Sequence, residues 1–337
     1  MKRSHISIFR FPFSAFRFPL SALRFPLSAF LVLLFASCEK VVEFDIEQTE
    51  PSVVVNALPM TDSLMFVNIT YSRFFLDNQT FRPVTDATVS VDINGTPLTL
   101  DQRDGANYGC TYRIAGGDSL VLHVQANGKT ITGATRAPLL PAITIDSAII
   151  DTLQPFTTGG ISFTLDDPAA VRNHYLVYIS ERDSGTRWNR WEERWDTIDT
   201  VVHSYFNCLN REVTDPAVNR AEGMMDYFNQ LLFSDSLIDG QQYSLTLAIP
   251  MLRDTAEHPI ERSYTLVVES LSPEAFRYIV AVGKAQGIGQ YFAEPARIYT
   301  NLSGGLGIFA AIARREYAIT FTYKQPEVPQ TGKSRKR

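Results

Sequence analysis

The sequence contains few of the residues that usually bind metals or carry catalysis. Its 337 residues include three cysteines and five histidines. No histidine stands at metal-ligand spacing from another histidine, a cysteine or a carboxylate, and no calcium-loop pattern occurs. We expect His123 to be structural within a strand, and His174, His203 and His258 to lie on the surface. The sequence therefore predicts neither a metal site nor a cofactor.

A basic surplus is also missing. The chain carries 31 Lys and Arg against 36 Asp and Glu, and five of the basic residues fall in the first 37 positions, which hold no acidic residue. The remainder is therefore clearly acidic. Because phosphate binding needs a basic surface, nucleic acid is excluded as a partner. Four basic residues gather in the last five positions, and we expect residues 325–337 to form a basic disordered tail.

No apolar run is long enough to span a membrane. Residues 30–36 fall short of the roughly 20 apolar residues that a spanning helix needs. The run follows basic residues and ends in Ala36, Ser37 and Cys38, although Phe35 stands where leucine is usual. This pattern predicts a bacterial lipoprotein signal peptide over residues 1–37, cleaved before a lipidated Cys38. Ordinary secretion with a free Cys38 thiol is the first alternative, and a transmembrane anchor is the second.

The same leader contains three copies of one heptad, at residues 9–15, 16–22 and 23–29. A proline in each copy excludes a continuous helix and therefore a coiled coil. Either the leader has expanded by repetition or translation starts further downstream. Residues 1–37 are therefore left out of the fold prediction.

Period-two alternation dominates the chain after a short acidic tether at residues 38–50. Turn residues such as Asn94-Gly95 and Asn127-Gly128 separate the apolar runs, because asparagine and glycine adopt positive φ readily. Closely spaced short strands of this kind are typical of an Ig-like antiparallel β-sandwich, predicted here over residues 51–137. The expected strands are 52–56, 65–72, 87–93, 96–100, 108–114, 119–125 and 130–135.

A second β-rich domain is predicted over residues 142–324, after the proline-bounded break at residues 137–141. One helix is expected over residues 271–283, with Ser272 as N-cap, Pro273 at the first helical position and Glu274 in the first turn. A second helix is expected over residues 215–232. The expected strands are 143–150, 161–165, 175–180, 242–249, 263–270 and 317–323.

Three motifs of catalytic type have simpler explanations. Asp118 and Ser119 in a Gly-Asp-Ser-Leu motif are expected to be a turn residue and a strand start, because no α/β pattern surrounds them. The glycines of Gly305-Leu-Gly-Ile-Phe-Ala310 lack a βαβ unit and are expected to allow a turn or close packing on a neighbouring strand. Asp166 and Asp167 read as a turn. No catalytic residue is predicted, although an enzyme remains open.

The remaining cysteines, Cys110 and Cys208, stand far apart in the sequence and in different predicted domains. Neither belongs to a Cys-x-x-Cys motif or shows zinc-ligand spacing. Two buried free thiols are favoured over a disulfide bond.

All three tryptophans fall within nine residues and alternate with arginines. Spacings of three and four would place them on one face of a helix. The favoured interpretation is that this stripe covers the protein's own sheet. The alternatives are a partner-docking surface, since Trp and Arg are typical interface residues, or a platform for sugars and other flat ligands. The candidate binding surface comprises Trp188, Trp191, Trp195, Arg190 and Arg194.

Several segments together resemble a known family. The most specific is Asn301-Leu-Ser-Gly-Gly-Leu-Gly-Ile-Phe309, within residues 294–309; the others are residues 38–45, 51–56, 83–89, 232–235, 239–243 and 271–278. They resemble the domain of unknown function 4249 family, lipoproteins of Bacteroidota. The resemblance implies an outer-membrane lipoprotein whose relatives tend to be encoded beside TonB-dependent receptors. It implies a two-part β architecture and no known catalytic residues.

The first functional hypothesis is a lipid-anchored accessory or ligand-binding protein of the outer membrane that works with a TonB-dependent transporter. The alternatives are an envelope-located hydrolase and a purely structural envelope lipoprotein. A hydrolase would need Asp166, Asp167 and nearby histidines such as His174 and His203 to meet in one site. The ligand, the membrane face and the partner remain open.

Overall fold

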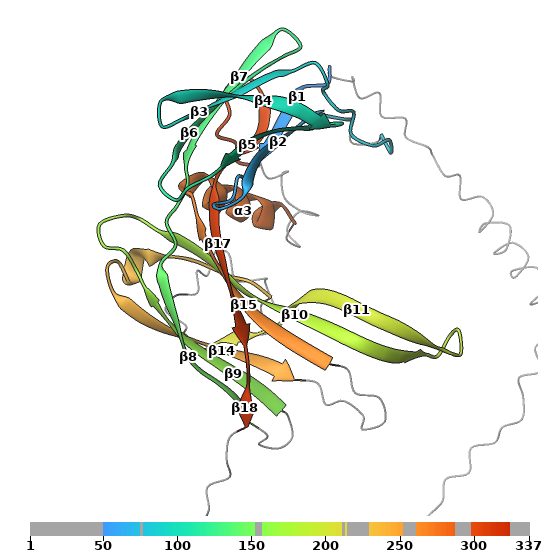
Figure 1. Ribbon diagram of the computed structural model, residues 1–337, viewed down its shortest axis with the longest axis vertical. Coiled ribbons are helices and arrows are strands. Elements are labelled where there is room, and N and C mark those ends of the chain that lie inside the picture. Colours follow the sequence, from blue (N-terminus) through green and yellow to red (C-terminus); the bar gives the residue numbers. More distant parts are fainter. Residues whose placement is uncertain are drawn as a thin grey trace, which may run out of the picture. The chain divides into compact units, whose positions relative to one another are not determined.

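The computed structural model describes residues 50–74, 77–151, 157–210, 213, 229–251, 261–286 and 298–323. The predicted signal peptide, Cys38, the basic tail and nearly all of the tether lie outside these residues. No helix among those described is long and apolar enough to cross a membrane. The described residues are mainly β, as predicted (Figure 1).

Strands β1 to β7 of the N-terminal half and β16 (Leu306–Phe309) form one folded-over sheet, with strand order β16-β1-β2-β5-β4-β3-β6-β7. The sheet folds over at strand β4. The first part of β4 pairs with β3 up to Leu100, and its second part pairs with β5 from Asp101 onward. The local strands are β1 Val53–Ala57, β2 Leu64–Tyr71, β3 Thr88–Ile93, β4 Thr96–Asp104, β5 Asn107–Arg113, β6 Ser119–Ala126 and β7 Lys129–Arg136.

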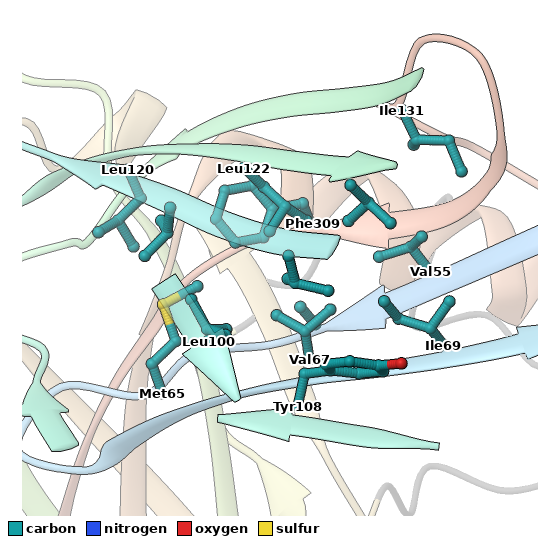
Figure 2. Packing of buried hydrophobic residues seen from close by; sticks show 14 of the residues in the cluster. Val55, Met65, Val67, Ile69, Leu100, Tyr108, Leu120, Leu122, Ile131 and Phe309 are labelled. Carbon is teal, nitrogen blue, oxygen red and sulfur yellow. The ribbon is translucent and has the colours of Figure 1, made fainter. Parts of the chain in front are cut away.

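Alternating side chains fill the space between the two layers of this sheet. Figure 2 shows Leu120 and Leu122 on one side facing Val67 and Tyr108 on the other. All four are essentially inaccessible to solvent. The sandwich predicted from the period-two pattern is therefore confirmed, and burial of this apolar surface is its main source of stability.

The predicted hairpin turns are present. Asn94 and Gly95, which join β3 to β4, have φ of 53° and 86°, and Asn127 and Gly128, which join β6 to β7, have φ of 49° and 68°. Two successive residues with positive φ match the right-handed twist of the flanking strands. The turn residues therefore set the pairing of these hairpins locally.

The second half contains two further sheets around a separate hydrophobic core that includes Phe163, Tyr175 and Phe233. One sheet has the order β11-β10-β15-β17, with β13 also paired to β10, and the other has the order β12-β14-β9-β8-β18. The strands of these two sheets are β8 Ala142–Asp151, β9 Thr157–Asp166, β10 His174–Asn189, β11 Arg194–Ser204, β12 Asn207–Cys208, β13 Leu231–Ser234, β14 Gln242–Met251, β15 Glu261–Leu271, β17 Ile312–Ile319 and β18 Thr322–Tyr323.

Helix α3, Pro273–Gln286, begins as the sequence predicts. Ser272 Oγ accepts hydrogen bonds from the backbone N–H groups of Ala275 (3.3 Å) and Ala311 (3.2 Å). The helix packs Phe276 and other apolar residues on the outer face of β10 and β15, where a third buried cluster forms. The N-cap thus fixes both the start of α3 and its position beside residue 311.

The second predicted helix, residues 215–232, lies outside the described residues except at its C-terminal end. There Leu231 and Leu232 begin strand β13, which pairs with β10. For these two residues the helix prediction is wrong, because both pair with β10 and their side chains alternate between two buried clusters, as in a strand. A short 3-10 turn, Asp235–Leu237, follows β13.

The first sandwich receives one strand from the far end of the chain. β16 pairs in parallel with β1, from Val54 opposite Leu306 to Ala57 opposite Phe309. Just before it, Ser303 exchanges two backbone hydrogen bonds with Thr132 of β7 (2.8 and 3.0 Å). We call residues Asn301–Ala311 the clip, since they join β7 to β1.

Side chains of the clip enter two different cores. Phe309 and Ala311 belong to the core of the first sandwich, whereas Ile308 and Ala310 belong to the cluster under α3. This alternation follows from the opposite directions of successive side chains in a strand. The described residues from Glu50 onward form one compact unit. The predicted domain boundary at residues 137–142 remains a prediction.

The glycines of the clip allow the close packing expected from the sequence. Gly307 has φ of 108°, and a Cβ at this position would lie 2.0 Å from the carbonyl oxygen of Val55. That distance is far below van der Waals contact. A side chain at position 307 would therefore push β16 away from β1.

Gly307→Ala should destabilise the protein by roughly 2 to 4 kcal/mol more than Gly95→Ala. Both substitutions force alanine to a positive φ, but Gly95 has no atom within 4 Å of its added Cβ. Urea unfolding of the two variants gives the difference. Equal losses would mean that the contact between β16 and β1 is unimportant for stability.

Candidate functional site

Strands β10 and β11 form a hairpin whose outer part extends past its sheet. β10 pairs with β15 as far as Ser184 opposite Glu261. From Gly185 to Asn189 its sole partner among the described strands is β11 (Figure 1). The end of the hairpin is therefore a two-stranded ribbon, and it carries the candidate surface.

The tryptophans do not lie on a helix, so this prediction is wrong. Trp188 and Trp195 are directly opposite each other across the hairpin, and Trp191 lies in the turn between them. Asn189 Oδ1 makes this turn by accepting hydrogen bonds from the N–H groups of Trp191 (3.1 Å) and Glu192 (3.2 Å). The β-branched run after Trp195 then favours an extended strand.

All three tryptophans are exposed to solvent, Trp191 almost completely, contrary to the favoured interpretation that they cover the protein's own sheet. Trp188 and Trp195 pack edge to face, with ring centroids 5.5 Å apart, and are 46% and 47% exposed. Trp191 is 95% exposed. The cross-strand pair stabilises the ribbon, whereas Trp191 has nearly its whole surface in solvent.

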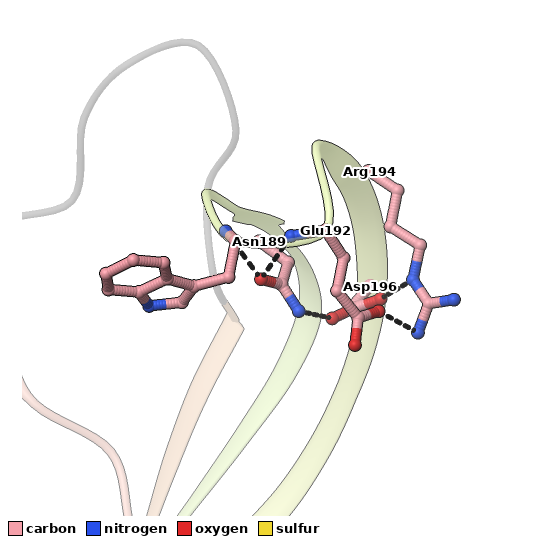
Figure 3. Close-up of polar contacts among 5 residues, drawn as sticks. Asn189, Glu192, Arg194 and Asp196 are labelled. Carbon is pink, nitrogen blue, oxygen red and sulfur yellow. Dashed lines mark hydrogen bonds and ion pairs between the residues drawn. The ribbon is translucent and has the colours of Figure 1, made fainter.

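A polar network on the same hairpin holds the turn. Asp196 accepts hydrogen bonds from Asn189 Nδ2 (2.8 Å) and Arg194 Nε (2.7 Å), and Arg194 also pairs with Glu192 at 2.7 Å (Figure 3). The bond from Asn189 and then that from Arg194 lower the pKa of Asp196. Arg194 is therefore engaged in holding the turn, while Arg190 lies exposed beside Trp191.

A second cluster consists of three carboxylates whose oxygen atoms lie within 4.8 Å of one another: Asp167, Asp235 and Asp239. Oxygen ligands at this spacing suit a hard divalent cation. Burial, together with the charges of Asp167 and Asp239, raises the pKa of Asp235 despite a backbone hydrogen bond. The cluster is the best metal-ligand geometry among the described residues.

These carboxylates also have a structural role. Asp167 accepts hydrogen bonds from Tyr175 Oη (2.5 Å) and the Gly240 N–H (2.9 Å). Asp235 accepts one from the Asn173 N–H (2.6 Å), and Asp239 accepts one from the Ala170 N–H (3.1 Å). The cluster thus joins the chain before β10 to the turn before β14.

The residues that a hydrolase would need are not gathered in one place. Asp167 bonds to Tyr175, while His174 points from the opposite face of β10 and stacks on Phe276 with centroids 4.3 Å apart. His203 is exposed on β11 and stacks on Tyr178 at 4.4 Å. The prediction that His174 lies on the surface is wrong, because α3 covers it and leaves it 7% exposed.

A buried polar group on the face of the sheet toward α3 was missed. Glu269 accepts a hydrogen bond from Tyr178 Oη (3.2 Å) and lies 3.9 Å from Arg314. Burial raises the pKa of Glu269, and burial with the charge of Glu269 raises the pKa of Tyr178 to about 12. In the sequence, this buried group could have been predicted from Glu269, which is the one charged residue in the mostly apolar segment 266–271.

Two other predictions are confirmed. Asp118 lies in a turn and accepts hydrogen bonds from Asn94, Tyr112 and the Ala115 N–H, and Ser119 begins β6. The Gly-Asp-Ser-Leu motif is thus part of a hairpin connection. Cys110 and Cys208 are both buried, and each is a thiol rather than half of a disulfide bond.

The model of the family described as "Domain of unknown function (DUF4249)" matches residues 39–318. The chain belongs to the DUF4249 family. No curated protein matches the chain. The match includes the whole clip and the hairpin, so both are parts of the DUF4249 domain.

Solved structures resemble the chain only weakly. One is a putative carbohydrate binding protein from Bacteroides uniformis ATCC 8492, with 11% identity, coverage of 65% of this chain and 89% of that chain, and a TM-score of 0.17. Another is the full-length major pilin SpaD from Corynebacterium diphtheriae, with 10% identity, coverage of 69% and 63%, and a TM-score of 0.20. Scores this low carry no functional argument.

Acid should destabilise the DUF4249 domain through His174. Burial, and then the charges of Arg172 and Arg277, lower the pKa of His174 from 6.5 to about 4. The unfolded chain therefore binds a proton at higher pH than the folded chain does. His174 therefore leaves the free energy of unfolding at its full value above pH 6.5. As the pH falls from 6.5 to 4, the unfolded chain gains a proton at this residue, and the free energy of unfolding decreases by about 3 kcal/mol.

His174→Asn should remove this part of the acid sensitivity. Unfolding free energies measured from pH 7 to pH 4 should fall by about 3 kcal/mol less in this variant than in the wild type. His203→Asn, at an exposed histidine, is the matched control. Parallel pH profiles for His174→Asn and the wild type would contradict the assignment.

Proposed function

We propose that this DUF4249 protein is a lipid-anchored accessory or binding protein of the outer membrane, and that the β10–β11 hairpin is its docking element. The main support for this proposal is the exposure of Trp191. Its side chain is 95% exposed at the end of a ribbon that extends past its sheet. Solvation of a whole indole is unfavourable, so a partner that covers it gains free energy.

The composition of the hairpin end fits a protein interface. Tryptophan and arginine are the residues most enriched among those that dominate binding energy, and here Trp191 and Arg190 are adjacent and exposed. The turn that carries them is held by Asn189 and the paired Asp196, so little ordering is needed on binding. A fixed, exposed tryptophan of this kind is suited to enter a pocket on a partner.

The membrane anchor rests on the sequence. Cys38 ends a leader of lipoprotein type, and the DUF4249 match begins at the next residue. A lipidated Cys38 followed by a tether of about 12 residues would keep the domain close to the membrane. The TonB-dependent transporter as partner rests on the family resemblance, and the hairpin is the surface that we assign to it.

Cys38→Ala should release the protein from the membrane without unfolding it. Cysteine is the attachment point for lipid, and the described fold begins beyond the tether. Fractionation of cells that express the variant should find it in the soluble fraction, with the circular dichroism of a β protein. A folded variant that stays with the membrane would refute the lipid anchor.

Trp191→Ala should abolish co-purification with a TonB-dependent barrel from detergent-solubilised outer membranes. The stability of the fold should change by less than about 0.5 kcal/mol, because the side chain is almost fully exposed. Phe81→Ala removes an exposed aromatic residue of the first sandwich and is the matched control.

Two outcomes would contradict the assignment. If the wild-type protein brings down no such barrel, the accessory role fails. If Trp191→Ala retains the barrel as well as Phe81→Ala does, the partner binds elsewhere and the hairpin is not the docking element.

A further inference from the structure

The first sandwich is incomplete without the clip. Within the described residues, β16 is the partner of β1 on the side away from β2, and Ser303 bridges the free side of β7. The clip also places Leu302 and Phe309 in the sandwich core, where Phe309 is fully buried. Without these residues, β1 and β7 would have open edges beside an uncovered apolar core.

One side chain organises the clip. Asn301 Nδ2 donates to the carbonyl oxygens of Ala134 (3.0 Å) and Phe309 (2.7 Å), and its Oδ1 accepts from the Phe309 N–H (3.0 Å). The amide therefore closes the loop from Asn301 to Phe309 and binds this loop to β7. Alanine at position 301 would break all three bonds.

The clip and the sandwich also match in shape. A Cβ at Gly304, whose φ is 84°, would lie 2.3 Å from the Thr130 carbonyl oxygen. In the other direction, a Cβ at Gly133 of β7 would lie 2.6 Å from Leu302 Cδ2. Each side lacks a side chain where the other needs room, which is a specific fit rather than general apolar contact.

We propose that the first sandwich is a strand acceptor, closed in a late and separable step by the clip of its own chain. The acceptor site lies between β1 and β7 and recognises a strand with an asparagine, glycines at the spacing of 304, 305 and 307, and a phenylalanine. This inference does not depend on the proposed function.

The order of events follows from the sequence separation. Strands β1 to β7 end at Arg136, whereas β16 begins at Leu306. Pairings between distant segments form slowly because a long loop must close first. During synthesis or export from the N-terminus, the acceptor therefore stays open until the last part of the domain has emerged.

A synthetic peptide with the sequence of residues 300–312 is the probe. In the full-length Gly307→Val variant, the chain's own clip cannot seat on β1. Amides of β1 and β7 should then exchange at least about 100-fold faster than in the wild type. The wild-type peptide should restore slow exchange in both strands, whereas the same peptide with Asn301→Ala or Gly307→Val should not.

Slow exchange of β1 and β7 in the variant without peptide would overturn the proposal, because the sandwich would then close without the clip. Equal rescue by the wild-type and substituted peptides would also overturn it, since the fit would be nonspecific. If the variant does not fold, refolding of the wild-type chain provides the second measurement.

In that measurement, labelled peptide is present during refolding from urea or is added to native protein. The proposal expects capture of the peptide during refolding and none by the native protein. Absence of capture in both cases, or equal capture in both, would contradict late closure. Capture of a second copy's clip would appear as a dimer at high protein concentration and would support the acceptor site.

Discussion

The parallel pairing of β16 with β1 is the interaction on which the rest of this structure depends. Residues 308–311 alternate between the core of the first sandwich and the cluster under α3, so one short segment serves both. Backbone hydrogen bonds from Ala310 to Ala57 and from Ile312 to Pro59, both 3.0 Å, continue the contact beyond β16. Because β17 starts at Ile312, the same segment leads directly into the sheet that carries the hairpin.

The hairpin depends on this framework for its position. The inner half of β10 is the central strand of its sheet, bonded to β11, β13 and β15. Its side chains enter the second core on one face and meet α3 on the other. Fixed on both faces, β10 can carry a ribbon with three exposed indoles without exposing its own core. The candidate docking element is thus an extension of one of the best buried strands in the molecule.

Sequence patterns predicted the features that depend on neighbouring residues in the chain. Alternation marked most of the strands, Asn-Gly pairs marked the turns, and Ser272 with Pro273 marked the start of α3. The tryptophan helix failed because positions 188, 191 and 195 fit a helical face and a hairpin equally well, and the turn made by Asn189 decided between them. His174 is buried by α3, which lies about 100 residues away in sequence. Strand β16 has four residues, one of them Gly307, and its parallel partner is about 250 residues away, so no local period could indicate it.

Native-state hydrogen exchange in increasing urea tests most directly whether β16 makes the first sandwich and the second half of the domain unfold together. The amides of Val67 in β2 and Leu247 in β14 are deep in the two separate cores. If β16 couples these cores, the opening free energies of the two amides should converge on one value with the same urea dependence. A Val67 amide that opens at a clearly lower free energy, with a smaller urea dependence, would show a first sandwich that unfolds on its own and would contradict the account.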